Sequence, residues 1–478
     1  MSIIAGTAIG VAGAVVGAGA AALTRKALDN DKSRPPHIYE YHVDNVWFEG
    51  TDFYGRRPNA PLKGEEKADI VIIGGGYAGL ASAYQLIQRY PQKRIVVIEG
   101  ATCGFGASGR NGGHVMAGMH GLQAVCKKQG PEAARKLWDM TYHGSEIIQE
   151  MVEKHGIDCD FERNGKLVMA MDDRQAKALK NFQGLYDAMG LESTWLTKDE
   201  LRKQFNSPRF IEGWKEPYSS QINPAKLVFG MRDMVEKLGV EIFEQTRVMK
   251  VEEGKTVKVK TEFGEIEAPQ IVVAVNGYAP HMGFFNNRIQ TVSTNVIATE
   301  PLTDAQLESC VWQDRISWCD MRALDFDYCI LSKDNRIVIG GDGVGVFYND
   351  GVHTGPYKPL NEKIKASLFD TFPQLEGIKI THEWGGTMGL TVNMWPAIGA
   401  MGEHKNIFYL GGWNGEGVAL SHVGGKVIAD LVAGEKSEFT ELPFVNKKFP
   451  YSGSDPVRLL GTKAYLKYLD KYGTNMLV

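Results

Sequence analysis

Three glycines and one acid have the types and spacing of a nucleotide-binding turn. Gly74, Gly76 and Gly79 form the pattern G-x-G-x-x-G, and Glu99 follows about 20 residues later. Gly74 permits a tight turn, Gly76 lets the backbone approach a pyrophosphate, and Gly79 lets a helix pack closely on a strand. A carboxylate at the position of Glu99 is suited to accept hydrogen bonds from ribose hydroxyls, and it would repel the extra phosphate of NADP. These residues therefore predict binding of a dinucleotide other than NADP.

A strand on each side of a helix is needed to hold these residues. The apolar, β-branched run at 70–73 predicts a buried parallel strand, 80–89 predicts a helix with small residues toward the sheet, and 94–98 predicts a second strand. The helix N-terminus would offer free N–H groups and a partial positive charge to phosphates. An ordinary βαβ unit with a glycine-rich turn is the alternative interpretation.

A second glycine-rich segment follows at 104–114. Five of its eleven residues are glycine, which favours a loop over a helix or strand. Backbone N–H groups, the Ser108 hydroxyl and the Arg110 guanidinium are suited to bind a pyrophosphate or the edge of a flavin ring. A flexible surface loop is the alternative.

The C-terminal part repeats the order of strand, glycine-rich turn and helix. Residues 406–410 predict a strand, 411–417 a turn and 418–433 a helix. A helix N-terminus at this point would stabilise the negative charge of a reduced flavin. A purely structural turn is the alternative. A further buried strand at 271–275, followed by Gly277, is expected beside the first strand.

The composition is that of a globular protein with more than one domain. The 478 residues are too many for one hydrophobic core, and the net charge of −4 gives no reason to expect nucleic-acid binding. The six cysteines include no C-x-x-C pair, so we expect no zinc or dithiol site and a reducing compartment. Cys103 is the one thiol close to the nucleotide-binding loop.

The chain begins with an apolar segment. Residues 3–23 carry no charge and are long enough to cross a bilayer as a helix, and Arg25 and Lys26 follow them. We therefore expect a membrane anchor at 1–26 with the catalytic domain on the cytoplasmic side. A cleaved targeting peptide and a tail on a cytoplasmic protein are the alternatives. Residues 27–65 are polar and contain prolines, which predicts a linker that packs along the folded body.

The middle of the chain contains helices and strands in alternation. Periodicity favours helices at 132–155, 174–189, 198–205 and 223–238, and a largely antiparallel sheet over 289–381 that covers a ligand. Short apolar runs predict strands at 166–170, 240–243, 290–299, 328–331 and 336–340. The fold class is therefore α/β, with a Rossmann-like domain interleaved with an antiparallel-sheet substrate domain and preceded by an N-terminal apolar helix. The expected boundaries are 66–118, 223–288 and 384–440 for the nucleotide-binding domain, 119–222 and 289–383 for the substrate domain, and 441–478 for a C-terminal tail that packs on the body.

Together these blocks resemble the FAD-dependent D-amino-acid-oxidase/glycine-oxidase family of amine oxidoreductases. The motifs that carry the resemblance are 74–80, 104–113, 157–160, 372–375 and 411–417. The likeness runs from about Ala68 to Tyr472, and the 104–113 block is its most specific part. The resemblance implies noncovalent FAD and oxidation of a C–N bond of an amine or amino acid by hydride transfer to flavin N5. It also implies that water hydrolyses the resulting imine and that oxygen or a membrane quinone reoxidises the flavin.

The resemblance assigns roles to individual residues. Val248 would touch the adenine through its backbone, and Gly277 would lie along the cofactor. The residues that would hold FAD are Gly74, Gly76, Tyr77, Ala78, Gly79, Glu99, Gly106, Ser108, Arg110, Asn111, Gly112, Gly113, Val248, Gly277, Trp413, Asn414, Gly415, Glu416, Gly417 and Val418.

The chain departs from the family's pattern in three ways. Glu416 stands where the relatives usually carry a histidine, and its carboxylate would alter the flavin potential, pair with a substrate ammonium or face solvent. Residues 386–396 contain no cysteine, so covalent attachment of FAD is not expected. The apolar segment 3–23 resembles that of the anchored L-amino-acid deaminases, which deliver electrons to a respiratory chain.

Hydride transfer from a neutral amine needs a dry pocket and an aligned C–H bond more than it needs acid–base chemistry. The catalytic candidates are His114 as a proton acceptor, Glu416 and Tyr328. Arg322 and Trp384 are candidates for substrate contacts, with ordinary structural roles as the alternative. No metal is expected. A membrane-linked flavoprotein dehydrogenase of another donor that passes electrons to quinone, and a non-catalytic FAD-binding protein, are the alternative functions.

Overall fold

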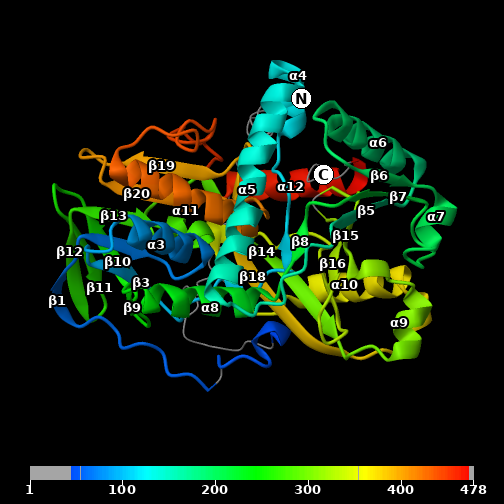
Figure 1. Cartoon of the computed structure of the whole chain (residues 1–478), viewed down its shortest axis with the longest axis horizontal. Coiled ribbons are helices and arrows are strands. Elements are labelled where there is room, and N and C mark those ends of the chain that lie inside the picture. Colours follow the sequence, from blue (N-terminus) through cyan, green and yellow to red (C-terminus); the bar gives the residue numbers. More distant parts are fainter. Residues whose placement is uncertain (1–44, 54, 324, 354, 473–478) are drawn as a thin grey trace, which may run out of the picture.

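The computed structural model describes residues 45–53, 55–323, 325–353 and 355–472. Figure 1 shows two sheet-containing halves side by side, one with helices α3 and α11 and the other with α6, α7 and α10. The long helix α5 (Pro131–His155) crosses between them in this view. The halves are described here as the nucleotide half and the substrate half.

A six-stranded sheet forms the nucleotide half. Its strand order is β19-β20-β13-β2-β3-β9, and every neighbouring pair except β19 with β20 is parallel. The strands are β2 (Ile70–Ile73), β3 (Ile95–Ile98), β9 (Glu241–Phe243), β13 (Gln270–Val273), β19 (Ala397–Met401) and β20 (Ile407–Gly411). The prediction that the strand before Gly277 lies beside the first strand is confirmed, because β13 pairs directly with β2.

The two faces of this sheet are covered by different elements. Ile70 and Ile72 pack into the core shared with the helices, whereas Val71 and Ile73 pack into the core shared with a four-stranded sheet. This division follows because successive side chains of a strand point to opposite faces. The helices are α3 (Tyr77–Arg89), α8 (Pro224–Lys237) and α11 (Gly417–Ala433). The four-stranded sheet contains β1 (Gly64–Lys67), β12 (Gly264–Ala268), β11 (Val257–Thr261) and β10 (Val248–Glu252).

An eight-stranded sheet forms the substrate half, in the order β18-β14-β17-β16-β15-β5-β7-β6. Its strands are β5 (Lys166–Ala170), β6 (Thr194–Leu196), β7 (Glu212–Glu216), β14 (Ile289–Thr299), β15 (Ser317–Asp320), β16 (Tyr328–Leu331), β17 (Ile337–Gly340) and β18 (Ile380–Thr391). The prediction of a largely antiparallel sheet is confirmed, with β15 and β5 as a parallel pair within it. Helices α7 (Lys198–Arg202), α9 (Asp304–Cys310) and α10 (Lys358–Thr371) share a core with the outer face. Helix α6 (Asp173–Ala188) instead shares a core with Val168 and Ala170 on the opposite face of β5.

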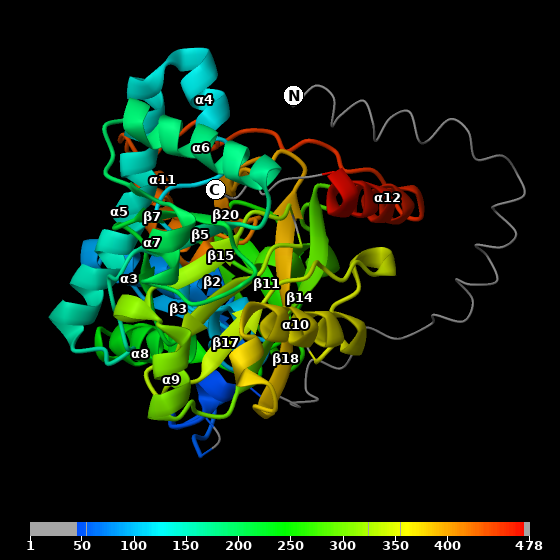
Figure 2. The same ribbon diagram turned by 90° about the vertical axis from the view of Figure 1, so that its right-hand side faces the viewer.

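The longest strands, β14 and β18, join the two halves. They pair from Ile289 opposite Thr391 to Ala298 opposite His382. Figure 2 shows the pair crossing the height of the molecule. The end near Ile289 and Thr391 packs against the 3-10 helix η4 (Asn276–Met282), which follows β13 of the nucleotide half. The pair therefore sets the distance between the two sheets.

Two helix boundaries are predicted wrongly, each by three residues: α3 begins at Tyr77 and not at Leu80, and the end of α7 also differs. The helix expected at 198–205 ends at Arg202, after which the N–H of Gln204 donates to the carbonyl of Leu201 in a turn. This turn directs Phe205 into the core, where its ring meets those of Trp312 and Phe372. Tertiary packing thus overrides the local helical pattern.

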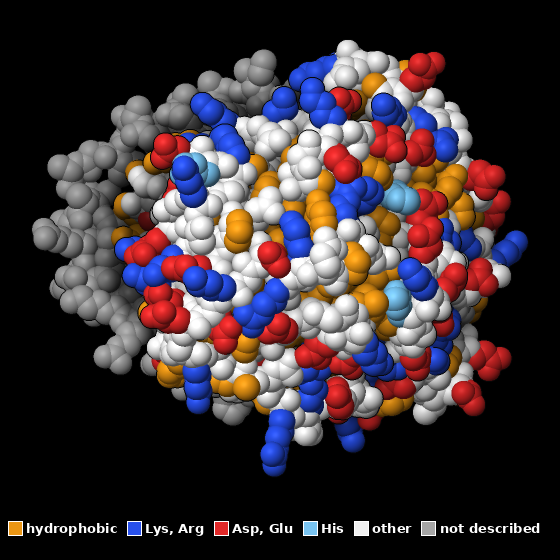
Figure 3. All heavy atoms as spheres, turned by 60° about the vertical axis from the view of Figure 1, so that its left-hand side comes forward, with side chains coloured by type: hydrophobic (Ala, Val, Ile, Leu, Met, Phe, Trp, Pro, Cys, Tyr) orange, Lys and Arg blue, Asp and Glu red, His pale blue; other side chains and the backbone are white. Residues whose placement is uncertain are grey.

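The remaining described elements lie around this frame. They are α4 (Leu122–Gln129), the short strands β4 (His114–Val115) and β8 (Ser220–Gln221), and the C-terminal helix α12 (Val457–Tyr472). Figure 3 shows basic and acidic side chains intermixed on one face of the molecule. Among the described helices, none combines the length and apolarity that a membrane span requires. The expected anchor at 1–26, with its apolar helix, lies outside the described residues, and the domain boundaries stay predictions.

Candidate functional site

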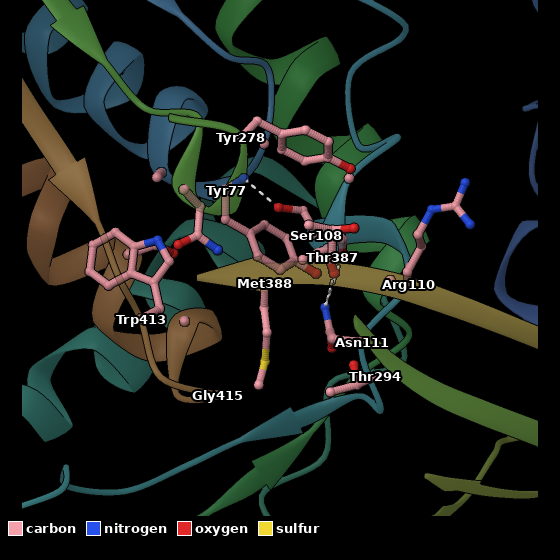
Figure 4. Close-up of a pocket in the computed structure, with 18 of the residues that line it drawn as sticks. Tyr77, Ser108, Arg110, Asn111, Tyr278, Thr294, Thr387, Met388, Trp413 and Gly415 are labelled. Carbon is pink, nitrogen blue, oxygen red and sulfur yellow. Dashed lines mark hydrogen bonds between the residues drawn. The ribbon is translucent and has the colours of Figure 1, made fainter. Parts of the chain in front are cut away.

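A cavity of about 690 Å³ lies between the nucleotide half and the inner face of the eight-stranded sheet. Its walls come from the turns after β2, β3, β13 and β20 on one side and from β5, β14, β15, β16 and β18 on the other. Parallel strands open their carboxyl ends at one edge of a sheet, where ligands bind in such folds. Figure 4 shows side chains from both halves around this cavity, including Tyr77, Ser108, Met388 and Trp413.

The glycine turn after β2 is shaped for close approach of a ligand. Gly74 has φ +111°, a backbone conformation that favours glycine, and a Cβ on Gly79 would lie 1.9 Å from the Gly74 carbonyl oxygen. A Cβ on Gly76 would lie 2.8 Å from Ser108 Oγ, which accepts a hydrogen bond from the Tyr77 N–H at 2.9 Å. Glycine is therefore required at the three positions for different reasons: Gly74 for the turn, Gly79 for helix packing and Gly76 for access to the cavity.

Glu99 lies partly buried just after β3 and lines the cavity. Its carboxylate accepts hydrogen bonds from the N–H of Gly75 at 2.7 Å and from the N–H of Ala101 at 2.9 Å. Burial raises the pKa of this carboxyl, while the two N–H groups oppose the rise. Val248 lines the same end of the cavity. Each carboxylate oxygen retains a lone pair for a further donor, as a ribose-binding acid needs.

The 104–113 loop folds into a compact wall of the cavity, so the alternative of a flexible surface loop is wrong. Residues Ala107–Gly109 form a 3-10 turn, and the Asn111 side chain donates to the carbonyls of Ala107 and Ser108. Arg110 lines the cavity, but its Nε donates to the Phe105 carbonyl at 2.6 Å and its guanidinium also reaches the Gly385 carbonyl on β18. Figure 4 shows this side chain directed away from the other labelled residues. Arg110 thus ties the loop to the substrate half.

The first described residues hold the outside of this loop. Asn45 donates to the Gly109 carbonyl at 2.8 Å, and the Trp47 indole donates to the Asn111 carbonyl at 2.9 Å. A Cβ on Gly109 would approach the Phe48 ring to 3.1 Å. These buried contacts show that the end of the predicted linker packs on the folded body, at the cavity wall. We refer to residues 45–48 as the N-terminal latch.

The far end of the cavity is formed by the turn before α11. Trp413, Asn414, Glu416 and Gly417 line it, and no side chain caps the N-terminus of α11. The Asn414 side chain accepts a hydrogen bond from the Thr391 N–H at 2.8 Å, which fixes the turn to the end of β18. The free N–H groups of the helix therefore face the cavity, as the sequence predicts.

Glu416 is a buried acid at this end. Its Oε2 accepts a hydrogen bond from the His120 backbone N–H at 3.2 Å, and its Oε1 lies 3.5 Å from the His120 imidazole. Burial raises the pKa of Glu416 to about 8, an effect that this N–H and the charge of Lys166 partly oppose. Of the alternatives left open by the sequence, a Glu416 carboxylate that faces solvent is wrong, because the residue is buried and lines the cavity.

The two other catalytic candidates form part of the wall on the substrate side. The rings of His114 and Tyr328 meet edge to face, with centroids 5.8 Å apart. Burial and the charge of Lys166 lower the pKa of His114 to about 4, so its imidazole is neutral and only weakly basic near pH 7. Burial raises the pKa of Tyr328 to about 12. Both side chains line the cavity.

Most of the predicted site residues line the cavity, but three do not. Gly79, Gly113 and Gly277 lie behind the wall, where a Cβ would meet the carbonyl oxygens of Gly74, Ile222 and Met388. The two candidates for substrate contacts also lie elsewhere. Arg322 pairs with the buried acids Asp320, Asp327 and Asp342, and the Trp384 indole donates to the Arg110 carbonyl. The cavity does reveal two charged residues that sequence reasoning missed, Lys166 and Arg247.

Thiols and metal ligands are two further possible sources of chemistry near the cavity. Cys103 is buried against Gly75, and burial raises the pKa of its thiol well above the usual value, which leaves it unreactive. All six cysteines are free thiols. In the described ranges no three histidine, cysteine or acidic side chains come together as a metal site would require.

The cavity fits the FAD that the resemblance implies. The glycine turn leaves room for a pyrophosphate where a Cβ would collide, and Glu99 supplies an acceptor for ribose hydroxyls. The uncapped N-termini of α3 and α11 face its two ends. By position the first end would hold the ADP part, and Trp413 to Val418 would hold the flavin part.

Known proteins resemble this chain over most of its length. A family model described as FAD dependent oxidoreductase (DAO) matches residues 69–431. A probable oxidoreductase, OrdL, of Haemophilus influenzae is 32% identical and aligns with 91% of this chain and 99% of its own length. The gamma-glutamylputrescine oxidoreductase of Escherichia coli is 31% identical, with 85% and 93% covered. Among solved structures, glycine oxidase from Geobacillus kaustophilus has a similar fold, with a TM-score of 0.68 at 20% identity and with 80% and 99% covered.

Proposed function

Because this chain belongs to the DAO family of FAD-dependent oxidoreductases, we propose that it oxidises a C–N bond of an amine or amino acid. The family membership that the motifs indicated is thereby confirmed. The observation that carries the proposal is that the glycine turn after β2 and the inner face of the eight-stranded sheet line the same cavity. FAD bound there supplies the hydride acceptor, and the substrate imine is released to water.

The protein's own residues orient the substrate and control its proton. The inner sheet face carries Tyr328 and neighbouring apolar side chains, which exclude water from the reacting C–H bond. Glu416 titrates near pH 8, so above that pH it accepts a proton from a substrate ammonium and leaves the neutral amine that the reaction needs. His114, with its low pKa, is the weaker base of the two.

Anaerobic reduction of the bound flavin tests this function. The FAD-loaded protein is mixed with a panel of amines and amino acids without oxygen, and the visible absorption of oxidised flavin is followed. We expect bleaching with at least one of them and recovery of the absorption on admission of an electron acceptor. Bleaching by hydroxy acids alone would identify a dehydrogenase of another donor, and a cofactor that no donor reduces would identify a non-catalytic FAD-binding protein.

Oxygen and a quinone are the two proposed electron acceptors. Once a substrate that reduces the flavin is found, the amount of hydrogen peroxide formed under air distinguishes the two acceptors. Stoichiometric peroxide identifies oxygen as the acceptor. Turnover that requires an added short-chain quinone, with little peroxide, identifies a dehydrogenase that feeds a membrane pool.

Contact with a membrane through residues 3–23, with the catalytic part on the cytoplasmic side, is a further proposal that rests on the sequence. Removal of residues 1–26 is expected to move the protein from the membrane fraction to the soluble fraction with its FAD retained. Equal sedimentation of both forms would contradict the proposal.

A further inference from the structure

Lys166 is a buried cation in the cavity wall without an ionic partner. It opens strand β5, its side chain is 5% exposed, and it lines the cavity. Its Nζ contacts the Met116 sulfur at 3.8 Å, and among the described residues it takes part in no salt bridge. A thioether sulfur is a weak acceptor, and an ammonium has three donors to satisfy. A buried charge in this state lacks the ionic partner that would offset its desolvation.

The charge of Lys166 acts on the whole substrate end of the cavity. Burial is the largest influence on the pKa of His114, Cys319 and Glu416, and the positive charge of Lys166 lowers the pKa of all three. These groups belong to three separate parts of the wall: β4, β15 and the turn before α11. Lys166 and the Met116 side chain that its Nζ contacts both line the cavity, so the ammonium lies at the cavity wall on the sheet side.

The neighbouring strand supplies a carboxylate that does not reach Lys166. Glu216 stands directly opposite Lys166 in the register of β5 and β7. Its Oε2 instead accepts hydrogen bonds from the N–H groups of Tyr218 and Ser219, at 2.5 and 3.1 Å. Its Oε1 has no hydrogen-bond partner, yet among the described residues no carboxylate oxygen lies within ion-pair distance of Lys166 Nζ. The ammonium is therefore available to an anion that enters the cavity.

From these observations we infer that Lys166 binds a carboxylate of the substrate, so that the enzyme acts on amino acids or on amines that carry an acidic group. The inference rests on the proposed function for the reaction and on Lys166 for the substrate class. An amine at the Glu416 end and a carboxylate at Lys166 would place a zwitterion across the cavity. A simple alkylamine would leave Lys166 unpaired, which makes it the poorer ligand.

Equilibrium binding tests the inference without turnover. The FAD-loaded full-length protein is titrated calorimetrically with matched pairs of small acids and their amides, such as acetate with acetamide and benzoate with benzamide. We expect the carboxylate to bind at least tenfold more tightly than its amide. Lys166→Met should lower carboxylate affinity by at least tenfold and abolish the preference, whereas Lys166→Arg should keep it. Lys198→Met removes an exposed lysine of the same half and should change nothing.

Each result decides the inference. A wild-type protein that shows no preference for the acid overturns the inference. A crystal structure of the FAD-loaded protein in which Lys166 forms an ion pair with Glu216 would also overturn it. A preference that survives in Lys166→Met also overturns it. If Lys166→Met fails to take up FAD, the wild-type pairs and Lys166→Arg still give the answer. Glu216→Gln should leave the preference intact, since Glu216 belongs to its own turn.

A turnover arm separates this inference from the proposed function. The rates of flavin reduction by glycine and methylamine, and by 4-aminobutyrate and butylamine, are compared, because each pair differs by a carboxylate. A higher kcat/KM for the acid than for its partner amine in wild type supports the inference. In Lys166→Met this difference should disappear, mainly because KM for the acid rises. Reduction by both members at equal efficiency overturns the inference while it supports the proposed function. Reduction by no amine contradicts the proposed function, and the binding experiment still decides the role of Lys166.

Discussion

The Glu416 carboxylate accepts a hydrogen bond from the backbone N–H of His120 at 3.2 Å, in a buried part of the cavity wall. This single donor does not compensate for burial, which is why the pKa of Glu416 rises to about 8 from its ordinary 4.5. Most of the acid–base behaviour expected of the enzyme near neutral pH follows from this pair.

The stability of the folded protein should therefore fall as pH rises through this range. The folded state binds the Glu416 proton more tightly than the unfolded chain, so its contribution is full below about pH 4.5 and is lost between pH 4.5 and 8. Glu416→Gln removes the titration. We expect the variant's melting temperature, relative to wild type, to be higher at pH 8.5 than at pH 5. A difference that is the same at both pH values would contradict the assignment.

The same residue should shape the pH dependence of the reaction. We expect the anaerobic rate of flavin reduction to increase with pH through an apparent pKa near 8, and this step should disappear in Glu416→Gln. Stopped-flow absorbance at saturating substrate measures it. The substrate amine titrates as well, so the comparison is made between wild type and variant with one substrate. An unchanged profile in the variant would assign the step to the substrate.

His114 should have the opposite effect on stability. Burial and Lys166 lower its pKa to about 4 from 6.5, so its contribution is full above pH 6.5 and is lost as pH falls from 6.5 to 4. We expect His114→Gln to reduce the acid-induced drop in melting temperature between pH 7.5 and 5. Tyr328→Phe, which keeps the ring against His114, is the control and should retain the drop. An equal drop in His114→Gln and wild type would show that other groups cause it.

Gly79 should tolerate no side chain. A Cβ there would lie 1.9 Å from the Gly74 carbonyl, so Gly79→Ala must displace the turn that faces the cavity. We expect the purified variant to contain little or no FAD. Gly184→Ala is the matched control, because this glycine lies in helix α6 with open space around it and should become more stable by about 0.5–1 kcal/mol. Flavin absorbance per protein measures the loss, and full occupancy in Gly79→Ala would refute the role of the turn.

Glu99→Gln should weaken FAD binding by about tenfold or more, which corresponds to about 1.4 kcal/mol. Both oxygens of Glu99 accept backbone N–H groups, from Gly75 and Ala101, and an amide NH2 would face one of these donors. Fluorescence titration of the apoprotein with FAD measures the change. Glu376→Gln, at an exposed acid, should bind FAD as wild type does. An unaltered dissociation constant for Glu99→Gln would show that the acid serves the fold alone.

The sequence predicts the nucleotide half well because its signals are local. The run at 70–73, the glycines and Glu99 lie within one βαβ unit, and their roles depend on contacts between near neighbours along the chain. The turn before α11 repeats the same local logic. Even there, Gly113 and Gly277 prove to be packing positions, because the close neighbours that require glycine come from distant strands.

The substrate half is less predictable because its side chains are selected by partners far away in sequence. Arg322 has the type of a ligand for an anion, yet three buried aspartates hold it. Lys166 has no motif around it. Its one signal is the strand pattern. Alternation places Lys166 on the same face as the apolar Val168 and Ala170, where a charged side chain is unusual. The sequence shows this pattern but does not identify the group that Lys166 binds.

The N-terminal latch has a mechanical consequence. Asn45 and Trp47 donate hydrogen bonds to the carbonyls of Gly109 and Asn111, so the first described residues contact the wall of the flavin cavity directly. A force applied at Asn45 would pass to this wall through these two hydrogen bonds. Proteolysis that removes residues up to 48 should loosen the cofactor, and it would also take Val46, Trp47 and Phe48 out of the core around α3 and α8. A change in the N-terminal latch is thus expected to alter the flavin-binding cavity directly.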